Sequence, residues 1–201
     1  FAAQSYERAM ASISSGRFKD EIVPVKIPQR KGDPIIFDTD ECCKETNLEF
    51  LSKMKPAFKK DGVGTAGNAS IISDGAAALV VMSEKKAKEL GCKIMATIGS
   101  QGSYGIDMKY VLMAPIFAIP KVLKKQGFAI SDIDLFEINE AFAGSSAGIN
   151  RVLELDPEKV NVNGGSVALG HPIGASGARV LTTLLYEMEK RSVNTGLASL
   201  C

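Results

Sequence analysis

Three polar residues stand out as candidates for chemistry: His171, Asn139 and Cys201. His171 is the only histidine in the chain, and it is flanked by glycines at positions 164, 165, 170, 174 and 177. Glycine allows close backbone approach and positive φ angles. Pro172 favours an extended His171 and is a good first residue of a helix. We therefore expect His171 to lie on a fixed turn between a strand and a helix, available to a ligand.

Asn139 and Cys201 each have two interpretations. Asn139 is either a cap of the helix that follows, with Glu140 in its first turn, or a polar group at the strand end where α/β folds place their sites. Taken alone, Cys201 is a buried structural thiol. Beside a histidine it becomes a candidate acid/base thiol, because an imidazole lowers a thiol pKa from about 8.5. A Cys–His pair indicates acyl chemistry, in a cysteine hydrolase or a thioester enzyme.

The glycine-rich stretch has a competing interpretation as a phosphate-binding loop at a helix N-terminus. Neither the G-x-G-x-x-G nor the G-x-x-x-x-G-K spacing occurs within this stretch, residues 161–179, so this interpretation is weak. We expect Gly174 and Gly177 to serve close packing of a helix against its neighbour.

Composition narrows the class of protein. The 201 residues are 45% hydrophobic and 23% charged with a net charge of +1, which predicts a soluble globular protein without a nucleic-acid or membrane partner. The four cysteines show no metal-binding spacing and fit a reducing compartment. The neighbours Cys42 and Cys43 form either a strained disulfide or, as we expect, a reduced pair. Both ends look cut, so we expect a fragment.

The elements that would position these residues follow from hydrophobic periodicity and turn signals. We expect helices over 5–15 (with Tyr6, Ala9, Met10 and Ile13 buried), weakly around 48–54, over 83–90, from Pro120 to just before Gly127, over 141–155, and after His171 with a stripe of Val180, Leu181, Leu184, Leu185 and Met188. We expect strands over 21–28, 35–37, 76–82, 93–99, 133–138, before His171, and from 196 onward. This alternation predicts a layered α/β fold.

Five motifs, in order along the chain, resemble the thiolases: Gly67-Asn-Ala-Ser70, Asn139-Glu-Ala-Phe142, Gly164-Gly165, Gly170-His-Pro-Ile-Gly-Ala-Ser-Gly-Ala-Arg179 and Gly196-Leu-Ala-Ser-Leu-Cys201. Asn161-Val-Asn163 and Pro172-Ile-Gly-Ala-Ser-Gly177 are typical of the short-chain, biosynthetic branch, the acetyl-CoA acetyltransferases. The resemblance covers the whole chain but only the second half of a thiolase subunit.

The resemblance implies a layered α-β-α-β-α architecture with mixed sheets. Residues 1–70 would be the later part of a loop domain, 71–92 the final segment of the N-terminal domain, and 93–201 a truncated C-terminal domain. The implied homodimer or homotetramer uses coenzyme A thioesters as substrates and no separate cofactor or metal. A cytoplasmic location is expected, and mitochondrial and peroxisomal forms exist in the family.

The resemblance also implies roles for individual residues. His171 would activate an upstream nucleophilic cysteine and help hold a thioester oxygen, Asn139 would orient a water there, and Cys201 would remove the α-proton. Ser70, Ala141, Phe142 and Val111 would line the pantetheine arm or the acyl pocket. The implied reaction is the Claisen condensation of two acetyl-CoA molecules to acetoacetyl-CoA and CoA, with thiolysis as its reverse. The fragment alone would be inactive, because the nucleophile lies outside it.

The sequence departs from the family pattern near the expected pantetheine arm. Ile71 and Ser73 stand where the family has Gly and Asn, and Val111 replaces a bulky, Met-like residue. These departures leave chain-length preference open. The alternatives are a longer-chain 3-ketoacyl-CoA thiolase and a non-catalytic, acyl-CoA-binding thiolase-like subunit.

Overall fold

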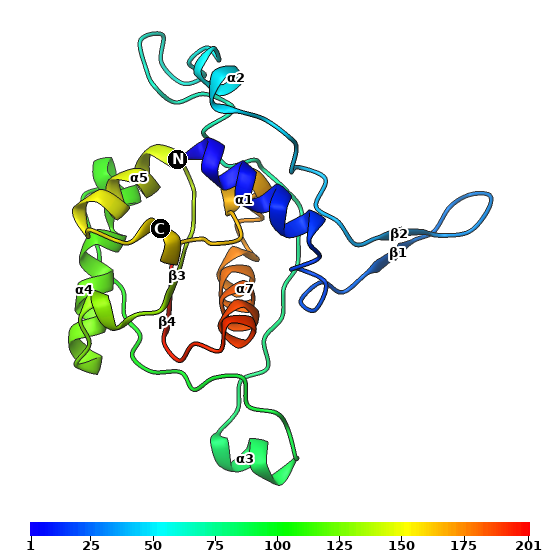
Figure 1. The fold of residues 1–201 in the computed structure, drawn as a ribbon, viewed down its shortest axis with the longest axis vertical. Helices are drawn as coiled ribbons and strands as arrows, with labels where there is room; N and C mark the ends of the chain where they lie inside the picture. Colours follow the sequence, from blue (N-terminus) through cyan, green and yellow to red (C-terminus); the bar gives the residue numbers. More distant parts are fainter.

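The computed structural model describes all residues from 1 to 201. A central body contains two parallel strands between helices, and three segments project from it (Figure 1). The projections carry the β1–β2 hairpin (Val25–Ile27 and Ile35–Phe37), α2 (Leu48–Ser52) and α3 (Glu84–Glu89). Both ends of the chain lie in the body. No helix combines the length and the hydropathy that a membrane crossing requires.

The body is built on β3 (Leu135–Ile138), which pairs in parallel with β4 (Gly196–Ser199). Side chains alternate between the two faces of a strand. Phe136 and Ile138 therefore share one face of β3, where they join a buried cluster with α4 (Pro115–Gln126) and α5 (Ala143–Val152). Glu137 points to the other face, where it meets Arg179 of α7 (Ser176–Arg191). The layers are thus helix, strand, helix.

A second cluster joins the start of the chain to the residues before His171. Helix α1 (Ala2–Ser14) packs against the single turn α6 (Ser166–Leu169). Tyr6 and Ala9 of α1 are buried with Val167 and Ala168 of α6. The 3-10 helices η1 (Met108–Met113), η2 (Ile130–Asp132) and η3 (Pro157–Lys159) complete the connections of the body.

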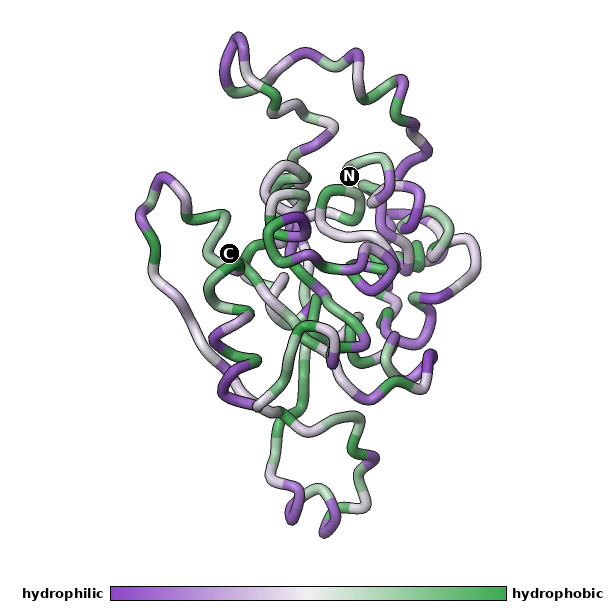
Figure 2. Tube along the Cα trace, turned by 60° about the vertical axis from the view of Figure 1, so that its left-hand side comes forward, coloured by the Kyte–Doolittle hydropathy of each residue, from purple (hydrophilic) through white to green (hydrophobic).

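The predicted strands over 76–82 and 93–99 are wrong. Neither segment forms a strand or pairs with another one, and hydrophobic side chains such as Val80 and Ile98 are exposed. Figure 2 shows the two segments as largely hydrophobic and α3 between them as hydrophilic. A strand needs a hydrogen-bonded neighbour, and the apolar pattern by itself does not supply one. Helix α3 begins as predicted, with Ser83 Oγ accepting a hydrogen bond from the Lys86 amide.

Two further predictions about elements need correction. Helix α4 begins at Pro115 and contains Pro120, whereas Gly127 ends it in the left-handed conformation as expected. Proline is best placed at the first position of a helix, and Pro115 occupies that position. The predicted strand before His171 is also absent, because the chain reaches His171 from the helical turn α6.

The buried faces of two helices are more polar than the sequence pattern predicts. Helix α1 buries Ser5 and Ser12, whereas Met10 and Ile13 are only half-buried. Helix α7 buries Val180 and Leu184 as expected but also Thr183 and Glu187, and Leu181, Leu185 and Met188 stay half-buried. These polar side chains hydrogen-bond across the body, as Ser12 does to Asn163.

Candidate functional site

The carboxyl ends of β3 and β4 bring two of the candidate residues to one edge of the sheet. Asn139 directly follows β3, and its backbone N–H donates to the backbone carbonyl of Ser199, the last residue of β4, at 2.9 Å. Cys201 lies two residues beyond Ser199. Parallel strands end on the same side of their sheet, so Asn139 and Cys201 lie along the same edge.

The segment 69–72 pairs with residues next to this edge at both of its ends and connects the other candidates. Ala69 bridges to Phe142, and the Ser70 amide donates to the Ala141 carbonyl at 3.1 Å. Farther along, Ile72 bridges to His171, whose amide donates to the Ile71 carbonyl at 2.8 Å. The structure therefore brings Ser70, Ala141 and Phe142 together and connects them through one strand-like segment to His171.

His171 and Asn139 lie side by side although 32 positions separate them in the sequence. Asn139 Nδ2 lies 3.4 Å from His171 Nε2, and His171 Nδ1 lies 2.6 Å from Ser176 Oγ. The structure thus places in contact the two residues to which the resemblance assigns one thioester oxygen. The predicted position of His171 at a strand end is wrong, since it follows a helical turn and precedes α7.

Two of the flanking glycines are required by the backbone. Gly170, just before His171, has φ of +100°, and a Cβ there would collide with Ser73. Gly164 has φ of +79°, and a Cβ there would lie 2.6 Å from the Ser5 carbonyl oxygen of α1. Gly174 and Gly177 have no other atoms within 4 Å of an added Cβ, so the predicted role in close helix packing is wrong for both.

Asn139 is held by side chains and does not cap a helix. Helix α5 starts after Phe142 without a side-chain cap, so the capping interpretation of Asn139 is wrong. Asn139 is only 2% exposed, and its Oδ1 accepts from Ser166 Oγ at 2.6 Å. Arg179 Nη2 in turn donates to Ser166 Oγ at 3.3 Å. Arg179 is thus linked to the side-chain amide of Asn139 through Ser166, and its Nη1 lies 3.7 Å from the Glu137 carboxylate.

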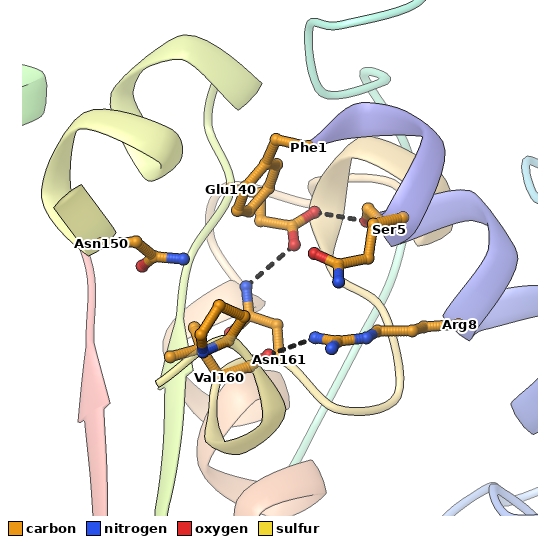
Figure 3. Close-up of a pocket in the computed structure, with 9 residues that line it drawn as sticks. Phe1, Ser5, Arg8, Glu140, Asn150, Val160 and Asn161 are labelled. Carbon is orange, nitrogen blue, oxygen red and sulfur yellow. Dashed lines mark hydrogen bonds between the residues drawn. The ribbon is translucent and has the colours of Figure 1, made fainter. Parts of the chain in front are cut away.

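Glu140, the next residue, is a buried structural anchor. Its carboxylate, expected in the first turn of a helix, is 1% exposed and accepts from Ser5 Oγ at 2.6 Å, Asn161 Nδ2 at 2.9 Å and the Val167 amide at 3.2 Å. Figure 3 shows Glu140 between Ser5 and Asn161. The cavity drawn there measures about 10 Å³, room for about one water molecule, so it is no substrate site.

The electrostatics of the site favour a neutral imidazole. Burial, aided by the positive charge of Arg179, lowers the pKa of His171 below its usual value. Burial raises the pKa of Glu137 to about 8, and Arg179 opposes that rise only in part. The uncharged form of histidine both accepts and donates a hydrogen bond, which suits it to move a proton.

Two predicted site residues, Cys201 and Val111, are more exposed than the others. Cys201 is exposed as a whole residue, but the atoms packed near its sulfur partly desolvate the thiol and raise its pKa. The expected lowering of this pKa by a neighbouring imidazole is therefore wrong. Val111 lies in η1, which packs against α5, and it is 41% exposed. All four cysteines are free thiols, and no group of three histidine, cysteine or acidic side chains is placed to bind a metal.

Sequence reasoning missed three residues that contact the site: Ser166, Ser176 and Arg179. All three lie inside or just before the motif around His171. Their polar character among glycine and alanine was the available signal. Their partners could not be read from it, because Asn139 is brought to Ser166 only by the fold, across 27 positions.

The sequence matches the family model of the thiolase N-terminal domain over residues 1–85 and that of the thiolase C-terminal domain over residues 92–201. It is 57% identical to the acetyl-CoA acetyltransferase of Thiocystis violacea and 53% identical to that of Pseudomonas aeruginosa. Each alignment covers 100% of this chain and 51% of the relative. The chain thus spans about half the length of these relatives.

Solved structures agree with the sequence comparison. The crystal structure of the Bacillus anthracis acetyl-CoA acetyltransferase matches with a TM-score of 0.96 at 46% identity, over 100% of this chain and 51% of that one. The human mitochondrial 3-ketoacyl-CoA thiolase matches with a TM-score of 0.92 at 38% identity, over 100% of this chain and 50% of that one. These matches confirm the predicted fold class. The chain, with its histidine and asparagine in contact at the edge of a parallel sheet, belongs to the thiolase family.

Proposed function

We propose that the protein carrying this chain transfers acetyl groups between coenzyme A thioesters, joining two acetyl-CoA molecules into acetoacetyl-CoA and CoA. The reverse reaction is thiolysis. The observation that carries this proposal is the contact of His171 Nε2 with Asn139 Nδ2 at 3.4 Å. The names of the similar acetyl-CoA acetyltransferases support the choice of substrate.

In the first step, His171 Nε2 takes the proton of an acyl-accepting cysteine, which we expect outside this sequence. The thiolate attacks the acetyl carbonyl carbon of acetyl-CoA, the thioester C–S bond breaks, and the CoA thiolate leaves and takes a proton from solvent, so His171 keeps its proton on Nε2 until the enzyme cysteine is freed as a thiolate. The geometry favours His171 for this role, because its neutral Nε2 has a lone pair and only Asn139 as neighbouring partner. A base for this step works best with a pKa near the working pH.

In the second step, Cys201 takes an α-proton from a second acetyl-CoA. The resulting enolate attacks the acetyl group on the enzyme cysteine, which leaves as a thiolate. Hydrogen-bond donors must stabilise the enolate oxygen, and we assign them to His171 after it has gained its proton and to a water held by Asn139. Since desolvation raises the pKa of Cys201, bound substrate or further protein must stabilise its thiolate.

The longer-chain 3-ketoacyl-CoA alternative is not favoured, because three curated relatives, at 53%, 55% and 57% identity, are named acetyl-CoA acetyltransferase. A non-catalytic acyl-CoA-binding subunit would have no use for a neutral histidine held by asparagine at the site edge. The division into domains at residues 70 and 92, the oligomeric state and the cytoplasmic location stay predictions.

The test is an acetoacetyl-CoA thiolysis assay of the full-length protein that carries this chain. We expect His171→Ala to lower kcat/KM by about 10²–10⁴-fold, the loss typical of a general base. Asn139→Ala should lower it by about 10²–10³-fold, as for a lost oxyanion donor. Asn194→Ala is the matched control, because Asn194 is exposed at the opposite end of β4. Unchanged turnover in both site variants would contradict the proposal.

A further inference from the structure

The hydrogen bonds that link Arg179, Ser166 and Asn139 can be donated in only one direction. Arg179 carries donors and no acceptor, and its Nη2 donates to Ser166 Oγ at 3.3 Å. The single hydroxyl proton of Ser166 is then free for Asn139 Oδ1, 2.6 Å away. Because Ser166 is 0% exposed and Asn139 2% exposed, bulk water cannot replace either partner. The amide oxygen of Asn139 therefore points toward Ser166.

This orientation of the Asn139 amide determines which nitrogen of His171 is protonated. With Oδ1 toward Ser166, the amide nitrogen Nδ2 faces His171 Nε2 at 3.4 Å. An amide nitrogen only donates, so Nε2 must present its lone pair. A neutral imidazole has one N–H, which then sits on Nδ1 and donates to Ser176 Oγ at 2.6 Å. Ser176 donates onward to the Pro172 carbonyl at 3.0 Å.

The opposite arrangement leaves groups without partners. A proton on Nε2 would face the Asn139 N–H group. Rotating the Asn139 amide to accept that proton would turn its NH₂ toward Ser166, which already accepts from Arg179. The buried Ser166 hydroxyl would then lose the acceptor of its own proton, and an unmet buried donor is unfavourable.

We propose that Arg179, Ser166 and Ser176 are positioning residues that hold resting His171 as the Nδ1-protonated tautomer. The tautomer itself follows from the hydrogen bonds, whereas its consequence for catalysis rests on the proposed function. In that reaction, Nε2 first accepts the thiol proton and then, as an N–H donor, holds the thioester oxygen. One nitrogen thus does both tasks without a turn of the ring.

Nuclear magnetic resonance of the full-length protein, labelled with ¹⁵N-histidine, tests the tautomer directly. His171 is the only histidine in these 201 residues, and the signals that disappear in His171→Gln are those of its imidazole. Long-range ¹H–¹⁵N correlations distinguish the two ring nitrogens. At a pH well above the pKa of His171 we expect the chemical shift of a protonated nitrogen at Nδ1 and of an unprotonated one at Nε2. A wild-type spectrum with the proton on Nε2 of His171 would by itself overturn the proposal.

Variants test the positioning residues. Ser166→Ala disconnects Arg179 from Asn139, and Ser176→Ala removes the acceptor of the Nδ1 proton. We expect each to lower the ratio of the Nδ1-H to the Nε2-H form by about fivefold, the worth of one ordinary hydrogen bond. Ser12→Ala is the matched control, since this buried hydroxyl donates to a different asparagine, Asn163, and should leave the ratio unchanged.

A ratio that is unchanged in both Ser166→Ala and Ser176→Ala, in folded protein, would also overturn the proposal. The spectra need no turnover, so their outcome is independent of the assay of acetoacetyl-CoA cleavage. If the tautomer is found but the full-length protein is inactive, the positioning residues stand and the proposed function fails.

Discussion

Replacing Glu140 by glutamine tests whether its buried carboxylate holds together the segments that frame the site. The three groups around this carboxylate, on Ser5, Asn161 and Val167, are all donors. They tie α1 and α6 to the residue next to Asn139. Burial raises the pKa of Glu140, and these same hydrogen bonds oppose the rise. The substitution keeps the size of the side chain but turns one acceptor oxygen into a donor NH₂ group.

Neither orientation of the new amide satisfies its neighbours. An NH₂ in the place of Oε1 faces the Asn161 amide, which cannot rotate because it both accepts from the Ile138 N–H and donates to the Ile138 carbonyl, each at 2.8 Å. An NH₂ in the place of Oε2 faces the Val167 N–H. One unmet buried donor costs about 1–3 kcal/mol. Glu140→Ala, which removes the acceptor of all three donors, should cost more than about 3 kcal/mol.

The assay is thermal unfolding followed by circular dichroism. For a chain of this size, a loss of about 2 kcal/mol lowers Tm by about 4–8 °C. Glu158→Gln is the control, because Glu158 is 81% exposed and pairs with Arg8 at the surface, where an ion pair is worth about 0.2–1 kcal/mol. A Glu140→Gln variant that melts no lower than Glu158→Gln would refute the reasoning.

Two other predictions concern the loop before His171 and the pH dependence of folding. In urea titrations, Gly170→Ala should lower the free energy of unfolding by at least about 1 kcal/mol, because φ is +100° and the new Cβ collides with Ser73. Gly177→Ala, in open space at the start of α7, should raise the free energy of unfolding by about 0.5–1 kcal/mol. Equal effects of the two substitutions would contradict the assignment. Burial raises the folded-state pKa of Glu137 to about 8 from 4.5, so the contribution of Glu137 to stability is complete below pH 4.5 and is lost as the pH rises through 8. The unfolding free energy of wild type minus that of Glu137→Gln should therefore fall between pH 5 and pH 8. A difference that stays constant over this range would contradict the prediction.

Local signals predicted the elements that end in caps or run through the core. The side chain of Ser83 starts α3, the left-handed Gly127 ends α4, and the mostly hydrophobic residues 135–138 form β3. These features depend on residues within one turn or one strand, so the sequence pattern contains their cause. The same holds for β4, whose alternating residues begin at Gly196 as expected.

Features that depend on distant partners could not be predicted in this way. The segments 76–82 and 93–99 have strand-like side chains, but no neighbour pairs with them. Ser5 and Ser12 look like surface positions in the sequence of α1 and are buried because Glu140 and Asn163 accept from them across more than 130 positions. At the site, sequence reasoning identified His171 and Asn139, whereas the residues that orient them emerge only in three dimensions.

The measurement that tests the central claim most directly separates the two chemical steps in the full-length protein. Labelled acetyl-CoA reports formation of the acetyl-enzyme, and acetoacetyl-CoA production reports condensation. A serine hydroxyl is far less acidic than a thiol, so Cys201→Ser should leave acetyl-enzyme formation largely intact while condensation falls by about 10²–10⁴-fold. His171→Ala should impair both steps, and Cys92→Ser, at another exposed free thiol, should impair neither. Equal loss of both activities in Cys201→Ser would contradict the account.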